Sequence, residues 1–196
     1  MAKYGVLRSS VNTGIDSELI AVFSAPLSIM SKKPSLLTET LTLKRKTAYS
    51  EIQRWEISTA LAPLTNSSEI FMHNVVNGYS ESFYVRMPQI YREKNLSSNL
   101  SPIVFANVAA SVATLNVAGL GGLLLPVGEF VKFQSHSKVY MVKESTLLGE
   151  NVNTITIFPS LVYPIVINEV VSFGSKVTMA AKYGDDTKIG VTYSDG

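Results

Sequence analysis

Apolar and polar residues alternate at every second position along much of this chain. Four segments show the pattern: 54–61, 82–87, 176–182 and 189–193. Because successive side chains of a β-strand point to opposite faces of the sheet, a period of two predicts strands with one buried and one exposed face. Within 82–87, it places Val85 on the buried face and Arg86 on the opposite one. The pattern predicts a mainly β fold built from antiparallel sheets.

Residues 128–161 combine short apolar runs with turn residues. Three strands are predicted in this stretch, at 130–133, 139–143 and 154–158, and Pro159 ends the last of them. A further strand is predicted at 112–117. Residues 98–166 would then hold four or five short strands, which is typical of a small closed barrel such as an OB-fold.

The polar, turn-rich segment 91–102 is the predicted domain junction. Residues 1–97 are expected to form a β-sandwich-like first domain, and residues 98–166 the small OB-like barrel. Since the last strands alternate like those of the first domain, we expect residues 167–196 to return and complete its sheet. The barrel would then be an insertion, and a simple two-domain split near residue 98 is the alternative.

One short helix is predicted within the first domain, over residues 67–77. Asn66 is placed to cap its N-terminus, and Glu69, three residues later, completes a capping-box pattern. Gly78 stands where a left-handed C-terminal cap belongs. The helix is expected to connect two strands.

Charged residues make up only 16% of the chain, against roughly a quarter in an average soluble protein. Because the centres of protein interfaces are depleted in Lys, Glu and Asp, this composition fits a protein buried by neighbouring subunits. A polar but uncharged surface on an ordinary soluble domain is the alternative. The net charge of +2 is too small to favour nucleic-acid binding. The longest apolar stretch, 103–125, is interrupted by polar residues and glycines, so no membrane span is expected.

Catalytic chemistry is not indicated. The chain has no cysteine, and its two histidines, His73 and His136, stand in no pattern that predicts a metal site or a catalytic triad. We interpret His136 as a turn residue with a local hydrogen bond. The glycine-rich loop 119–122 lacks the Gly-Lys-Ser/Thr sequence of a phosphate-binding loop. Asp185 and Asp186 are explained by a hairpin connection. We therefore expect no enzymatic activity and no cofactor or metal.

A basic cluster lies on a predicted strand near 40–47, which we expect to have one basic, exposed face. Stacking aromatics at regular spacing are missing, so we interpret the cluster as a solvated face or as charges that pair with a neighbouring subunit, not as a nucleic-acid site. Five residues are candidate subunit contacts: Lys44, Arg45, Lys46, Arg54 and Glu56. Trp55, between the last two and on the opposite face, is predicted to be a core anchor.

The run PVGEFVKFQSHSKVYMVKE, followed after a loop by NTITIFPSLV, resembles the second domain of the distal tail proteins of long-tailed bacteriophages. The similarity is to the branch whose second domain is a small OB-like barrel. Upstream, LKRKTAYSEIQRWEISTALAPL and SESFYVRMP are similar to that family's first domain. The resemblance covers most of residues 38–161, and related modules occur in baseplate proteins of contractile tails. The shared residues are strand-core and turn residues.

The resemblance implies a structural virion protein, made in the host cytoplasm and located in the tail or baseplate. It implies a homo-oligomeric ring, typically a hexamer, at the distal end of the tail tube. The implied partners are other copies of the chain, the tail tube protein and a baseplate hub or tail tip protein, without nucleic acid or membrane insertion. The second domain would lie on the outside of the ring.

Residues 1–36 have no counterpart in the resemblance, and we expect them to form an arm that docks on a neighbouring subunit. Two alternatives stay open. One is another baseplate component of a contractile tail. The other, from a different functional class, is a carbohydrate- or oligonucleotide-binding β-barrel module.

Overall fold

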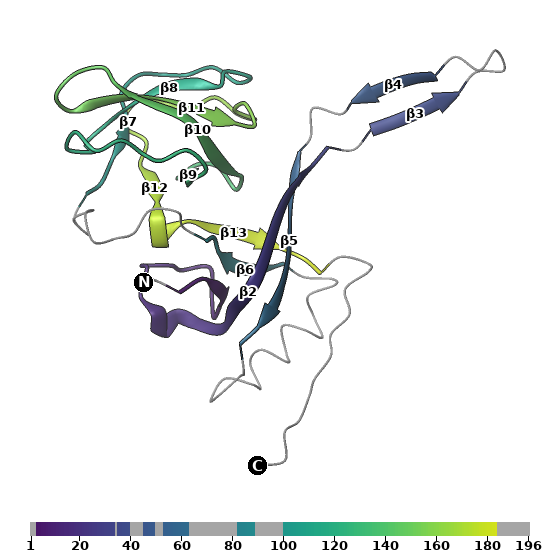
Figure 1. Cartoon of the computed structure of the whole chain (residues 1–196). Helices are drawn as coiled ribbons and strands as arrows, with labels where there is room; N and C mark the ends of the chain where they lie inside the picture. Colours follow the sequence, from purple (N-terminus) through teal and green to yellow (C-terminus); the bar gives the residue numbers. More distant parts are fainter. Residues whose placement is uncertain are drawn as a thin grey trace, which may run out of the picture. The chain divides into compact units, whose positions relative to one another are not determined.

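A computed structural model of the chain describes residues 3–33, 35–39, 45–49, 53–62, 82–88 and 100–183. Strands dominate this part of the chain, so the predicted mainly β fold is confirmed (Figure 1). The chain forms two compact units: unit 1 comprises Met1–Val22 with Leu64–Gly196, and unit 2 comprises Phe23–Pro63. The predicted helix at 67–77 and the predicted strand at 189–193 lie outside the described residues.

Five antiparallel strands form the first sheet, in the order β13-β6-β1-β2-β5. They are β1 (Gly5–Leu7), β2 (Leu19–Lys32), β5 (Arg54–Leu61), β6 (Phe83–Arg86) and β13 (Thr178–Ala181). The strand β13 pairs with β6 along its whole length, although residues 87–177 separate the two in the chain. The chain thus returns to this sheet after a second group of strands.

The N-terminal segment is an integral part of the first sheet. Strand β1 lies between β2 and β6, and all three of its residues are buried. A Cβ atom added at Gly5 would collide with the carbonyl oxygen of Ala21, so only glycine allows the two strands to approach this closely. The prediction that residues 1–36 form an arm docking on a neighbouring subunit is therefore wrong for β1 and for the part of β2 that pairs with it. A buried strand of three residues is too short to show an alternating pattern.

The second group of strands forms a barrel, in the order β12-β9-β10-β11-β8-β7. Its strands are β7 (Ile103–Val104), β8 (Thr114–Ala118), β9 (Phe130–Phe133), β10 (Val139–Leu147), β11 (Val152–Phe158) and β12 (Val171–Phe173). The order β12-β9-β10-β11 is that of a Greek key, because three consecutive strands are joined by hairpins and the fourth lies beside the first. A bridge between Ile103 and Val170 and a 2.9 Å hydrogen bond from Val104 N to Glu169 O join the two end strands and close the sheet.

The predicted barrel-like fold is therefore confirmed, although the bounds of several strands differ from the predicted ones. Strand β9 has the predicted bounds, whereas β10 continues to Leu147 and β12 lies beyond the expected boundary at residue 166. Six strands take part within the described residues instead of four or five. Strand β7 has only two residues, too few for a periodic signal. The prediction that residues 167–196 complete the first sheet is wrong for β12, which pairs with β9 in the barrel.

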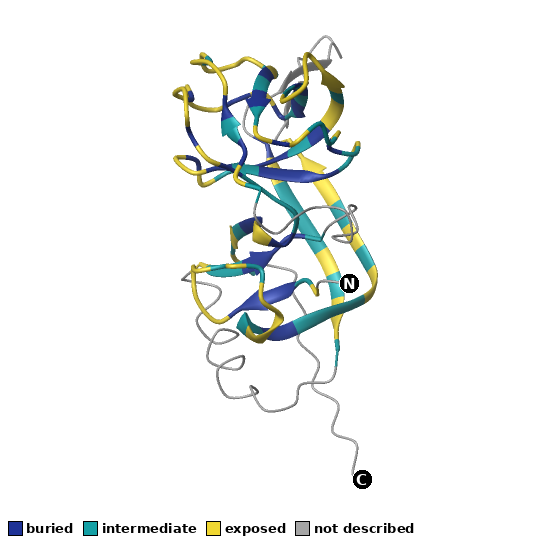
Figure 2. Cartoon of the chain, turned by 90° about the vertical axis from the view of Figure 1, so that its left-hand side faces the viewer, coloured by how far each residue is buried: buried dark blue, intermediate teal, exposed yellow. Residues whose placement is uncertain are grey.

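The barrel has its own hydrophobic core, visible as buried residues along its strands in Figure 2. Strand β11 shows the alternation directly, since Asn153, Ile155 and Ile157 are buried and the residues between them are partly exposed. Phe133 on β9 and Tyr140 on β10 are fully buried and lie 5.5 Å apart, measured between ring centroids. Closure of the sheet encloses these side chains, as in other small barrels.

Unit 2 consists of paired strands. The second half of β2 pairs with β5, from Phe23↔Leu61 to Lys32↔Arg54, and β3 (Ser35–Glu39) pairs with β4 (Arg45–Tyr49). The prediction of one strand near 40–47 is wrong in its bounds, because β4 begins at Arg45 and residues 40–44 are outside the described residues. An alternating pattern alone does not fix where a strand begins. Here the start of β4 is set by its pairing with β3, in which Arg45 lies opposite Glu39.

Candidate interaction surfaces

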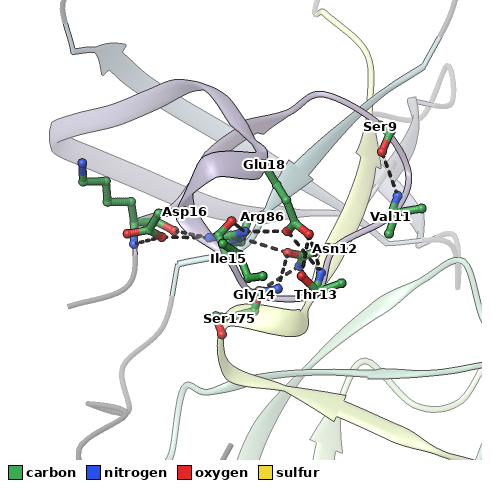
Figure 3. A network of polar contacts seen from close by, with 11 residues as sticks. Ser9, Val11, Asn12, Thr13, Gly14, Ile15, Asp16, Glu18, Arg86 and Ser175 are labelled. Atoms are coloured by element: carbon green, nitrogen blue, oxygen red, sulfur yellow. Dashed lines mark hydrogen bonds and ion pairs between the residues drawn. The ribbon is translucent and has the colours of Figure 1, made fainter.

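Arg86, on β6, is completely buried and uses all five N–H donors of its guanidinium (Figure 3). The acceptors are Asn12 Oδ1, Asp16 Oδ1, Glu18 Oε2 and the carbonyl oxygens of Lys3 and Ile15, at 2.7–3.3 Å. The expected position of Arg86 on an exposed face is therefore wrong. Burying a cation is costly unless it is paired and hydrogen-bonded, and here two carboxylates and three further oxygens compensate it.

The segment 8–18, here called the N-terminal loop, is fixed by these contacts. Thr13 donates from its backbone N–H and its hydroxyl to the Glu18 carboxylate, and Asn12 Nδ2 donates to the Ser175 carbonyl at 2.8 Å. Ser175 belongs to a short 3-10 helix, Gly174–Lys176, that follows β12. The fixed loop holds Val11 and Ile15 outward, about three-fifths exposed. Two apolar side chains thus stand on an ordered surface.

We expect the folded chain to lose stability in acid because of Glu18. The hydroxyl of Thr13, and to a smaller degree Arg86, holds the pKa of Glu18 below its ordinary value of 4.5. The stabilisation is present above the pKa of the unfolded chain and is lost as the pH falls through the lower pKa of the folded chain. Urea unfolding between about pH 6 and pH 3 measures this. The Glu18→Gln variant is expected to show a weaker pH dependence; an equal dependence would contradict the assignment.

His136 lies in the turn between β9 and β10 and is buried. Its Nδ1 is 2.7 Å from the Tyr140 hydroxyl, which accepts a hydrogen bond from Val162 N, and burial raises the pKa of Tyr140. The predicted local hydrogen bond of His136 is therefore confirmed. Tyr163 covers the His136 ring edge-on, at 5.9 Å between ring centroids. The arrangement packs a polar turn against the barrel core.

The predicted subunit contacts are only partly described. Arg54 and Glu56 form an ion pair at 2.8 Å, and Lys32 on the paired strand approaches the same carboxylate at 2.6 Å. These contacts lower the pKa of Glu56, through the Lys32 hydrogen bond first. Lys44 lies outside the described residues, and Arg45 and Lys46 are described only as backbone in β4. The structure therefore brings Arg54 and Glu56 together within one chain.

The paired parts of β2 and β5, residues 27–32 and 54–59, form a ribbon with two different faces. The cross-strand register places one set of side chains on the polar face: Ser28, Met30, Lys32, Arg54, Glu56 and Ser58. The other set forms the apolar face of the ribbon: Leu27, Ile29, Trp55, Ile57 and Thr59, with Ser31. The large side chains of the apolar face are only partly buried. Trp55, which the sequence predicted to be a core anchor, is partly buried on this face.

A second apolar surface, here called the barrel patch, lies where the barrel closes. Its members are exposed apolar side chains with 40–63% exposure: Phe105, Val162, Tyr163, Val166, Ile167 and Val170. The segments 103–108 and 165–171 run side by side, joined by the Ile103–Val170 and Val108–Ile165 bridges and by a 2.7 Å hydrogen bond from Ile167 N to Asn107 Oδ1. The two segments that carry Phe105, Val166, Ile167 and Val170 are therefore neighbours in the fold.

Other predicted features have simpler explanations. Glycines 119, 121 and 122 have positive φ angles, a backbone conformation that glycine adopts without strain. Within residues 3–33, 35–39, 45–49, 53–62, 82–88 and 100–183, no three His, Cys, Asp or Glu side chains are grouped so that they could hold a metal ion. His73, Asp185 and Asp186 lie outside these ranges. No helix in the same ranges is long and apolar enough to cross a membrane.

Comparisons with known proteins add no family to this description. No model of a known protein family matches the chain, and a search of curated proteins found no relative.

Proposed function

We propose that the chain is a structural virion protein of a phage tail that assembles into a ring at the distal end of the tail tube and joins the tube to a hub or baseplate. The resemblance of residues 38–161 to distal tail proteins motivates this function. The low charge of the chain and its two partly exposed apolar surfaces support it, because a subunit that works by being buried against its neighbours needs such surfaces.

The ribbon of β2 and β5 is the observation that carries the proposal. Two-stranded ribbons are marginally stable in water unless another layer covers one face. The apolar face of the ribbon holds Ile29 opposite Ile57, and both side chains are only partly buried within the chain. A neighbouring subunit that packs against this face would bury it further, and a ring supplies a neighbour to every subunit.

The test is to mix the purified protein with a tail tube protein and a hub protein of the same phage and to follow their association. The proposal expects discrete rings in negative stain and binding to tube or hub. If the protein binds neither and instead binds an oligosaccharide, the ring proposal is wrong and the carbohydrate-binding alternative takes its place.

The basic residues of unit 2 allow a residue-level prediction. Replacing Lys44, Arg45 and Lys46 with glutamate is expected to leave the fold intact and to impair assembly, since rim charges guide association and register more than they add affinity. The measurement is ring formation against protein concentration, with circular dichroism as the check on folding. The Lys143→Glu variant, which changes an exposed residue of β10, serves as the control. Normal assembly of the triple variant would show that this face is only solvated.

A further inference from the structure

We propose that the N-terminal loop fixes the connection between the barrel and the first sheet, and that release of the loop lets the barrel move. The connection consists of residues 174–177, here called the return segment, through which the chain leaves β12 of the barrel and enters β13 of the first sheet. This device lies within one chain and does not depend on the proposed ring.

Asn12 joins the N-terminal loop to the return segment (Figure 3). Its Nδ2 donates to the carbonyl oxygen of Ser175 at 2.8 Å, across 163 positions of the chain. Its Oδ1 accepts from Arg86 Nε at 3.1 Å and from Gly14 N at 3.2 Å. An amide side chain can do both because it carries donors on nitrogen and an acceptor oxygen. One side chain therefore ties the return segment to the last residue of β6.

Gly14 gives the loop and the return segment a second contact. Its φ angle is +94°, and a Cβ atom added there would lie 2.6 Å from Ser175 Oγ. Glycine thus lets the loop backbone lie directly against the short 3-10 helix, where a larger residue would be strained and would displace Ser175. Two positions of the loop, Asn12 and Gly14, therefore meet the same residue of the return segment.

The return segment is also fixed where it enters the first sheet. Val177 and Met87 are completely buried, and Met87 N donates to the Val177 carbonyl oxygen at 3.0 Å. The next residue, Thr178, lies opposite Arg86 in the pairing of β13 with β6. Arg86 therefore acts on the return segment twice, through its pairing with Thr178 and through the side chain of Asn12.

The barrel does not need the N-terminal loop for its own core. Among the described residues, its core cluster is drawn from residues 104–171, outside both the loop and the return segment. One net hydrogen bond changes an equilibrium constant by roughly tenfold or less, which lies in the range of local opening and well below global unfolding. The contact of Asn12 with Ser175 can therefore open while the barrel stays folded.

The Asn12→Asp variant separates this contact from the rest of the loop. The two side chains have the same shape, and a carboxylate oxygen can still accept from Arg86 Nε. A carboxylate has no donor, however, and its second oxygen would face the Ser175 carbonyl oxygen. The matched control is Ser9→Ala in the same loop, since the Ser9 hydroxyl accepts a hydrogen bond from Val11 N and not from the return segment.

Hydrogen exchange of single backbone amides in the full-length chain measures the release. The amides of Val177 and Met87 are hydrogen-bonded at the return segment, and that of Ile157 is hydrogen-bonded within the barrel. In Asn12→Asp, we expect exchange at Val177 and Met87 to be faster by about tenfold, with Ile157 unchanged. Ser9→Ala should exchange like the wild type. Unchanged exchange at Val177 and Met87 in Asn12→Asp would overturn the proposal.

Nuclear magnetic resonance relaxation of the backbone ¹⁵N nuclei measures motion of the barrel. The quantity compared is the ratio of the rotational correlation times of barrel and first sheet, because assembly slows the tumbling of both. We expect a ratio of one in the wild type and a smaller ratio in Asn12→Asp. An unchanged ratio would show that the loop does not control the barrel, even if the return segment exchanges faster.

A second variant keeps the test decisive if Asn12→Asp fails to fold by circular dichroism. Asn12→Ser then replaces it, because the serine hydroxyl is too short to reach both Arg86 and Ser175. Faster exchange at the return segment together with a smaller ratio of correlation times would support the proposal. Wild-type values of either quantity in the folded serine variant would contradict it.

Discussion

Replacing Arg86 with alanine is expected to lower the free energy of unfolding by about 3–5 kcal/mol, the usual cost of removing one partner of a buried ion pair. The side chain is completely buried and donates five hydrogen bonds, two of them to the carboxylates of Asp16 and Glu18. Without it, these carboxylates lose their cation, and the carbonyl oxygens of Lys3 and Ile15 lose their donor. Urea unfolding at neutral pH measures the loss.

The Arg86→Lys variant separates charge from geometry. Lysine keeps the positive charge but has three donors on one atom, so it cannot reproduce the five bonds of the planar guanidinium. We expect it to recover only part of the lost stability. The N-terminal loop should also become susceptible to proteolysis in the alanine variant, because Asn12 and Glu18 are held there by Arg86. Full stability of either variant would show that the loop is held by other contacts.

Replacing Phe133 with alanine is expected to cost about 3–5 kcal/mol, since the side chain is fully buried in the barrel and its removal leaves a cavity. The Trp55→Ala variant is the matched comparison. Trp55 is larger but only partly buried in the ribbon, so its loss in a single chain should cost only about 1 kcal/mol.

Both variants are measured by chemical unfolding of the monomer and then by ring formation. We expect Phe133→Ala to unfold the barrel and Trp55→Ala to impair assembly more than folding. An effect of Trp55→Ala on monomer stability as large as that of Phe133→Ala would contradict the assignment of the ribbon face as an interface. It would restore the interpretation of Trp55 as a core anchor.

The strands with clear alternation were predictable from the sequence. The bounds of β5 are the predicted ones because its eight residues alternate, and those of β9 because turn residues bracket its short apolar run. The short strands β1 and β7 were not predictable, since two or three residues carry no period. The pairing of β12 with β9 in the barrel, where the first sheet was expected, is decided by partners far away in the chain. Closure of the barrel between Ile103 and Val170 was not predictable for the same reason, because the two residues are far apart in the chain.

The candidate interaction surfaces were only partly predictable. Arg54 and Glu56 were named from their positions on an alternating strand, and the structure shows why they lie together: Lys32 and Arg54 flank one carboxylate. The burial of Arg86 could not be read from the pattern, because its acceptors come from a loop about 70 residues away in the chain. The barrel patch depends on two segments that become neighbours only when the barrel closes.

We propose that this chain assembles through its own surfaces into a closed ring. Native mass spectrometry of the purified wild-type protein over rising concentration tests it most directly. A ring-forming chain is expected to give one dominant oligomer of fixed size, with six copies, which negative-stain images show as a ring. A protein that remains monomeric at every concentration, and also in the presence of the tail tube protein, would contradict it.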